Sequence, residues 1–72
     1  MIYKFTTIIN KEGKLFVARC VELGVVSQGK NIESAQVNLK EAVELYLEGE
    51  PRAKKFAVSS PALISTLEVA NV

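Results

Sequence analysis

Few residues in this sequence could do chemistry, and they are widely spaced. The 72-residue chain has no His and no Asp, one Cys, and eight acidic residues that are all Glu. A Ser or Cys nucleophile needs a neighbouring base such as His, and two-metal phosphoryl transfer needs clustered carboxylates. Neither arrangement follows from this composition. We therefore expect no catalytic residues, no metal site and no cofactor, and we interpret the chain as a protein that is not an enzyme.

The remaining reactive side chains have simpler structural explanations. Cys20 lies within a predicted strand, on its proposed core face, where a small buried side chain is the default over a reactive thiol. Glu41, Glu44 and Glu48 recur at helical spacing, which is typical of a solvated helix face. These residues favour a folded scaffold over a reaction centre.

A single basic cluster is formed by Arg52, Lys54 and Lys55, whereas the net charge of the chain is only +1. As a structural feature, the cluster places cations near the negative end of a preceding helix. As a functional feature, it would be a weak phosphate-contacting patch, displayed several-fold in an oligomer and without interleaved aromatic residues for base stacking. A weak nucleic-acid-binding protein is therefore one alternative function.

One amphipathic helix is predicted from Asn31 to Glu48, and it organises the rest of the chain. Asn31 can cap its first turn, while Gly49 suits a left-handed closing position and Pro51 prevents continuation. At about 100° per residue, its apolar side chains form one stripe. The stripe consists of Ile32, Ala35, Leu39, Ala42, Val43 and Tyr46. This stripe needs an apolar surface to cover it.

Strands predicted on either side of the helix supply that surface. The first runs from Ile2 to Ile9, and a polar loop from Asn10 to Lys14 leads to the second, from Leu15 to Val21. The third covers Val25 to Gln28, and the last covers Leu63 to Val69. The order predicts one α+β domain over residues 1–72: a three-stranded antiparallel meander, the helix, and a final strand parallel to the first.

Both faces of the predicted sheet carry apolar side chains. Phe16, Ala18 and Cys20 form the expected core face of the second strand. The opposite face and the far side of the helix carry further apolar residues, which are Ile2, Ile8, Leu15, Val17, Val37 and Leu45. They are either scattered exposed aliphatics or a contact with another chain. A domain this small without a disulfide often oligomerises, so we predict a homo-oligomer, either a dimer or a tetramer.

Targeting signals are not evident in the sequence. Its apolar runs are too short for a transmembrane helix, and the N-terminal residues alternate in character instead of forming a signal peptide. We therefore expect a soluble, cytoplasmic protein.

The run from Phe16 to Glu48 carries several short motifs in a fixed order. The strand reads FVARCVEL, the next strand VSQG, and the helix NLKEA followed by ELYL. Taken together, these motifs resemble the HicB family of antitoxins and antitoxin-like proteins. The chain departs from the family pattern at Val21, where Pro is frequent, and at Ser34, where Glu would complete a capping box with Asn31.

The resemblance implies a fold similar to a truncated ribonuclease H, without the carboxylates of that enzyme. It also implies a partner, because HicB-like antitoxins neutralise a small toxin that cleaves mRNA, and they commonly self-associate. We expect the partner to contact Glu22, Val25, Ser27 and Gln28 around the turn. Many members add a DNA-binding domain, which we do not expect here because the sequence ends at the last predicted strand. A solitary homo-oligomeric module with an unknown ligand is the alternative.

Overall fold

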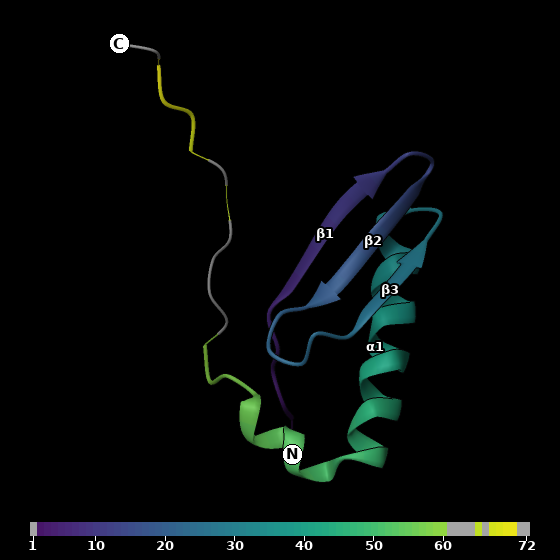
Figure 1. Cartoon of the computed structure of the whole chain (residues 1–72), viewed down its shortest axis with the longest axis vertical. Helices are drawn as coiled ribbons and strands as arrows, with labels where there is room; N and C mark the ends of the chain where they lie inside the picture. The colour runs from purple at the N-terminus through teal and green to yellow at the C-terminus, as the bar shows by residue number, and fades with distance from the viewer. Residues whose placement is uncertain (1, 61–64, 66, 71–72) are drawn as a thin grey trace.

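The computed structural model of the chain describes residues 2–60, 65 and 67–70, and it shows a sheet with one long helix packed on one face (Figure 1). The elements are β1 (Thr7–Glu12), β2 (Leu15–Cys20), β3 (Val26–Gly29), α1 (Ile32–Gly49) and the 3₁₀ helix η1 (Pro51–Phe56). The strands are antiparallel neighbours in the order β1-β2-β3. This arrangement confirms the predicted α+β class, with an antiparallel meander followed by a helix.

The hairpin between β1 and β2 is tighter than predicted. The strand ladder continues to the pair formed by Glu12 and Leu15, so the turn contains only Gly13 and Lys14 instead of a loop over 10–14. Gly13 has a φ of +60°, which suits the first central position of a two-residue type II′ turn. The chain can reverse here because glycine adopts this angle at little steric cost.

The start of β1 differs from the prediction. The expected strand over 2–9 is wrong in its first part, because the described residues before Thr7 belong to no strand. The Thr6 N–H donates to Glu22 Oε1 at 2.7 Å, and the Lys4 carbonyl accepts a hydrogen bond from the Val58 N–H at 2.8 Å. Tertiary partners thus replace the strand ladder in this segment and override its β propensity.

Both ends of α1 follow from local chemistry. Asn31 is the predicted cap: its Oδ1 accepts from the Ser34 N–H at 2.7 Å, and Ser34 Oγ accepts from the Asn31 N–H at 3.2 Å. Ser34 therefore completes the capping box in place of Glu. The predicted left-handed conformation of Gly49 is wrong, because Gly49 is the last residue of the helix and its φ is not positive. Glu50 instead leaves the helix with a φ of −139°, because Pro51 disfavours the helical conformation before it.

A small core lies between α1 and the sheet. Its buried residues are Ala18, Cys20, Ala35 and Leu39. Partly buried side chains pack around them: Phe5, Ile9, Phe16, Leu23, Val25 and Val43. The predicted inward orientation of Phe16, Ala18 and Cys20 is confirmed. Ile32 and Tyr46, at the two ends of the predicted apolar stripe, remain 49% and 42% exposed, so the sheet does not cover the whole stripe.

β3 approaches the first turn of α1 very closely. A Cβ added to Gly29 would lie 2.5 Å from Ser34 Oγ and 2.7 Å from the Ser34 carbonyl carbon, and it would also collide with the Ala35 backbone nitrogen. One turn further along, Asn38 Nδ2 donates to the carbonyl oxygen of Gln28 at 2.8 Å. Position 29 therefore requires glycine, because there is no room for a side chain between β3 and α1.

After α1 the chain forms the 3₁₀ helix η1, which carries the basic cluster of Arg52, Lys54 and Lys55. Of the expected last strand over 63–69, residues 63, 64 and 66 lie outside the described residues, and Ser65 and residues 67–69 belong to no strand. Neither of the described helices combines the length and the apolar character needed to cross a membrane.

Candidate functional site

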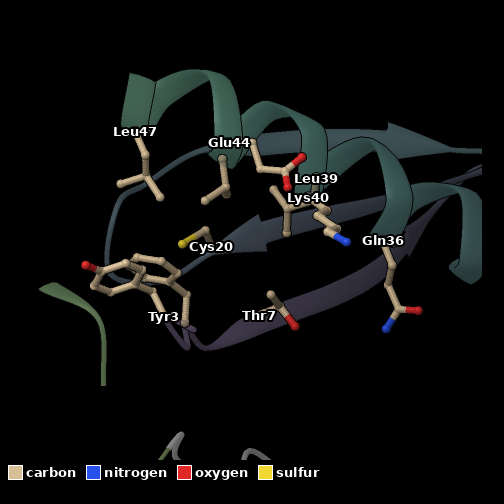
Figure 2. A pocket seen from close by; sticks show the side chains of 10 residues that line it. Tyr3, Thr7, Cys20, Gln36, Leu39, Lys40, Glu44 and Leu47 are labelled. Atoms are coloured by element: carbon tan, nitrogen blue, oxygen red, sulfur yellow. The ribbon is translucent and has the colours of Figure 1, made fainter. Parts of the chain in front are cut away.

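An open apolar groove lies between α1 and β1, and we call it the α1–β1 groove (Figure 2). It exists because α1 packs mainly over β3 and β2, so that the inner side of β1 is only partly covered. The groove has a volume of about 410 Å³. It is lined by Tyr3, Phe5, Thr7, Cys20, Gln36, Leu39, Lys40, Val43, Glu44 and Leu47.

The groove has an apolar interior and a polar rim. Leu39 and Leu47 point from the helix toward the sheet, and Cys20 lies between the two layers (Figure 2). Gln36, Lys40 and Glu44, on successive turns of α1, supply polar groups along one side. An apolar surface with a few polar groups at its edge is the usual construction of a binding site.

The backbone of β1 adds hydrogen-bonding capacity beside this groove. β1 is an edge strand of the described sheet, since only β2 pairs with it. The Thr6 carbonyl accepts from the Val21 N–H at 2.9 Å, which places the backbone groups of residue 6 on the β2 side. Because these groups alternate along an antiparallel strand, those of Thr7, Ile9 and Lys11 face the open edge. An extended partner segment could pair with them.

Cys20 is fully buried at the floor of the groove. Burial raises the pKa of its thiol above the ordinary value, and this outweighs the backbone hydrogen bonds from Leu23 and Glu22, which act in the opposite direction. A thiol in this state is a poor nucleophile. Within the described part of the chain, no group of three or more His, Cys, Asp or Glu could hold a metal ion.

Glu22 was predicted to contact a partner, and the structure places it at the turn after β2. Its carboxylate accepts the Thr6 N–H at 2.7 Å. Desolvation opposes its ionisation, but the hydrogen bonds from the Thr6 side chain and backbone and from its own N–H prevail and lower the pKa of Glu22. Glu22 therefore has a structural partner within the chain, and it ties the turn to the segment before β1.

The other three residues predicted for the partner contact lie on different sides of the sheet. Val25 packs against the core, and Ser27 is opposite Ala18 on the side facing the helix. Gln28 is opposite Val17 on the uncovered face. Val25 and Ser27 therefore lie on the core side of the sheet, whereas the side chain of Gln28 lies on the opposite side.

The residues predicted for oligomer contacts do not form one continuous surface. Ile8, Leu15 and Val17 share the uncovered sheet face, where Val26, which the sequence reasoning missed, is 54% exposed. The rest of the set is strongly exposed elsewhere: Ile2 at 86%, Val37 at 56% and Leu45 at 67%. Val26 could have been found from its alternation with Gln28 in the third strand.

The α1–β1 groove was also missed, because its lining comes from the N-terminal segment, two strands and the helix. The sequence marked Leu39 and Val43 as part of the apolar stripe of the helix, which identifies apolar side chains but not the part of them that stays uncovered. To predict the open groove, one would need to know how far the helix is displaced across the sheet, and the sequence pattern does not contain this.

Fold and groove together define a class of small α+β proteins in which one helix covers part of a three-stranded antiparallel sheet. A UPF0150 protein of Helicobacter pylori is 47% identical to this chain over 49 residues, which cover 65% of the chain and 67% of that relative. The chain belongs to the UPF0150 protein family. No protein-family model matches the chain, and no solved structure matches it.

Proposed function

We propose that this chain is a non-catalytic binding protein of the HicB-like antitoxin type, which neutralises a small toxin that cleaves mRNA. The α1–β1 groove is the observation that carries the proposal, because it combines apolar surface, a polar rim and an unpaired strand edge. The HicB-like motifs between Phe16 and Glu48 supply the class of partner. The protein acts in the cytoplasm as a homo-oligomer.

The mechanism is occlusion of the toxin's RNA-binding surface. Such a surface is basic, because it contacts phosphates. Glu44 on the groove rim attracts it, and the neighbouring Glu41 and Glu48 extend the acidic face of α1. Apolar contacts with Val43 and Leu47 then hold the complex. Charge sets mainly the association rate, and buried apolar contacts set mainly the lifetime.

Self-association uses a different surface. The uncovered sheet face carries the partly exposed side chains of Ile8, Leu15, Val17 and Val26. Joining two such faces removes apolar surface from water and leaves both grooves free. A solitary oligomer without a toxin is the competing reading, and it is an outcome of the test below.

The first experiment is a pull-down of the tagged protein from its own cells, with mass and stoichiometry measured on the eluate. We expect a small basic protein in a defined ratio, and addition of this chain should inhibit its cleavage of RNA. Recovery of self-oligomers alone, with no small partner, would overturn the antitoxin function.

Variants then locate the interface. Leu47→Lys should weaken binding of the recovered toxin by at least about tenfold, because it places a charge in the apolar groove. Glu44→Lys should slow association and reduce its salt dependence. Glu12→Lys is the matched control, since it makes the same charge change at the β1–β2 turn, away from the groove. Equal effects of the two Glu reversals would show that the groove is not the contact.

A further inference from the structure

The 3₁₀ helix η1 presents cationic side chains on one face. In a 3₁₀ helix, residues three apart are eclipsed, so Arg52 and Lys55 point in the same direction. They border a shallow hollow of about 310 Å³ that is also lined by Tyr46, Glu50, Ala53 and Phe56. We call four of these residues, Tyr46, Arg52, Lys55 and Phe56, the η1 patch.

Exposed aromatic rings lie beside these cations. Phe56 is 51% exposed and Tyr46 is 42% exposed, although both are large apolar side chains. Lys55 Nζ lies 5.3 Å from the centre of the Phe56 ring. Further along η1, Lys54 Nζ lies 5.4 Å from the ring of Tyr3. The basic cluster therefore does have aromatic neighbours: Phe56 is part of η1, and α1 and the N-terminal segment bring Tyr46 and Tyr3 to it.

The cations of the patch are available to a ligand. Arg52 forms an ion pair with Glu50 at 3.1 Å, but its side chain remains 87% exposed, and such surface pairs hold their partners weakly. With Glu50 included, residues 50–56 carry three cations and one acidic residue. Their local charge is thus more positive than the net charge of +1 of the chain.

We propose that the η1 patch binds single-stranded nucleic acid. An unpaired base stacks on Phe56, with Tyr46 beside it, while Arg52 and Lys55 contact the adjoining phosphates. Stacking accepts every base, so binding has little sequence preference. A duplex is a poor fit because its bases already stack on one another and are not free to cover these rings. This activity is independent of the proposed toxin binding, since the η1 patch shares no residue with the α1–β1 groove.

The test is fluorescence anisotropy with the full chain and a fluorescein-labelled 12-nucleotide oligouridylate, across a series of salt concentrations. The DNA oligothymidylate of equal length and an RNA duplex serve as comparison probes. We expect salt-dependent binding to both single strands and at least about tenfold weaker binding to the duplex. Absence of salt-dependent binding to either single strand, or equal binding to the duplex, would overturn the proposal.

Three variants separate stacking from charge. Phe56→Leu should weaken binding about tenfold without changing the salt slope, and Phe56→Tyr should restore it. Lys55→Gln should lower the slope of log K against log salt by about 0.7. Lys11→Gln is the matched control, because Lys11 also lies over an aromatic ring, that of Phe16 at 5.9 Å, but in β1.

Each result has a defined meaning. Circular dichroism first establishes that every variant is folded, and the half-exposed position of Phe56 makes its replacement tolerable. If Lys11→Gln weakens binding as much as Lys55→Gln, the attraction is diffuse and the η1 patch is not a site. If Phe56→Leu binds as well as the parent chain, no base stacks there. Loss of RNA binding with toxin binding intact separates this proposal from the antitoxin function.

Discussion

The two sides of the helix–sheet interface differ in how completely they are closed. On the β3 side, Gly29 lets the strand come into contact with the first turn of α1, and Asn38 bonds to the Gln28 carbonyl. On the β1 side, the same helix stands away from the strand and leaves the α1–β1 groove. Figure 1 shows this asymmetry as a helix set toward β3. The comparison teaches that stability is concentrated on one side, which leaves apolar surface free on the other.

The largest expected effect is on the free energy of unfolding, and it distinguishes two leucines on the inner side of α1. Leu39 is 3% exposed in the core, whereas Leu47 is only partly covered above the groove. Leu39→Ala should lower the free energy of unfolding by about 3 kcal/mol, and Leu47→Ala by less than about 1 kcal/mol, in urea denaturation. Equal losses would mean that the groove is closed in solution by another chain or segment.

The next largest effect tests the close contact between β3 and α1, by comparing the stability of two glycine variants. Gly29→Ala should cost about 2 kcal/mol, because the new Cβ meets the helix backbone closer than 3.0 Å. Gly49→Ala, at the end of α1, meets nothing within 4 Å and should stabilise by about 0.5 kcal/mol, since alanine favours the helix. Thermal denaturation of both variants measures the difference. A neutral Gly29→Ala would contradict the tight approach of β3.

A smaller effect on stability is expected from the hydrogen bond between Glu22 and Thr6, which holds the segment before β1. Glu22→Ala removes the acceptor of the Thr6 N–H and should cost about 1 kcal/mol at neutral pH. The folded pKa of Glu22 lies below its unfolded value, so its contribution is complete above the unfolded value, about 4.3, and is lost as pH falls through the folded pKa. The parent chain should therefore lose more stability than Glu22→Gln between pH 7 and pH 3.

That measurement has a clear contrary outcome. If urea midpoints of the parent chain and of Glu22→Gln fall in parallel with pH, ionised Glu22 contributes nothing to the fold. The segment before β1 would then be held by the backbone bonds from Val58 to Lys4 and from Val21 to Thr6.

Much of the fold could be predicted because its signals are local. The capped helix, the meander and the inward orientation of Phe16, Ala18 and Cys20 follow from periodicity and turn chemistry. The start of β1 could not be predicted, because the residues before Thr7 have strand propensity but bond to Glu22 and Val58 instead.

The candidate sites were less accessible to prediction than the fold. Arg52 and Lys55 were recognised as basic, but Tyr46 joins them only because η1 turns the chain back beside the end of α1. Propensity and spacing describe neighbours along the chain and carry no information about such contacts.

The sequence by itself determined the α+β class, the position of α1 and the absence of His and Asp, because periodicity and composition act locally. Only the tertiary structure decided which part of the apolar surface stays open. That choice depends on how far α1 is offset toward β3, and the offset is set by the missing side chain at Gly29 together with the packing of the whole layer.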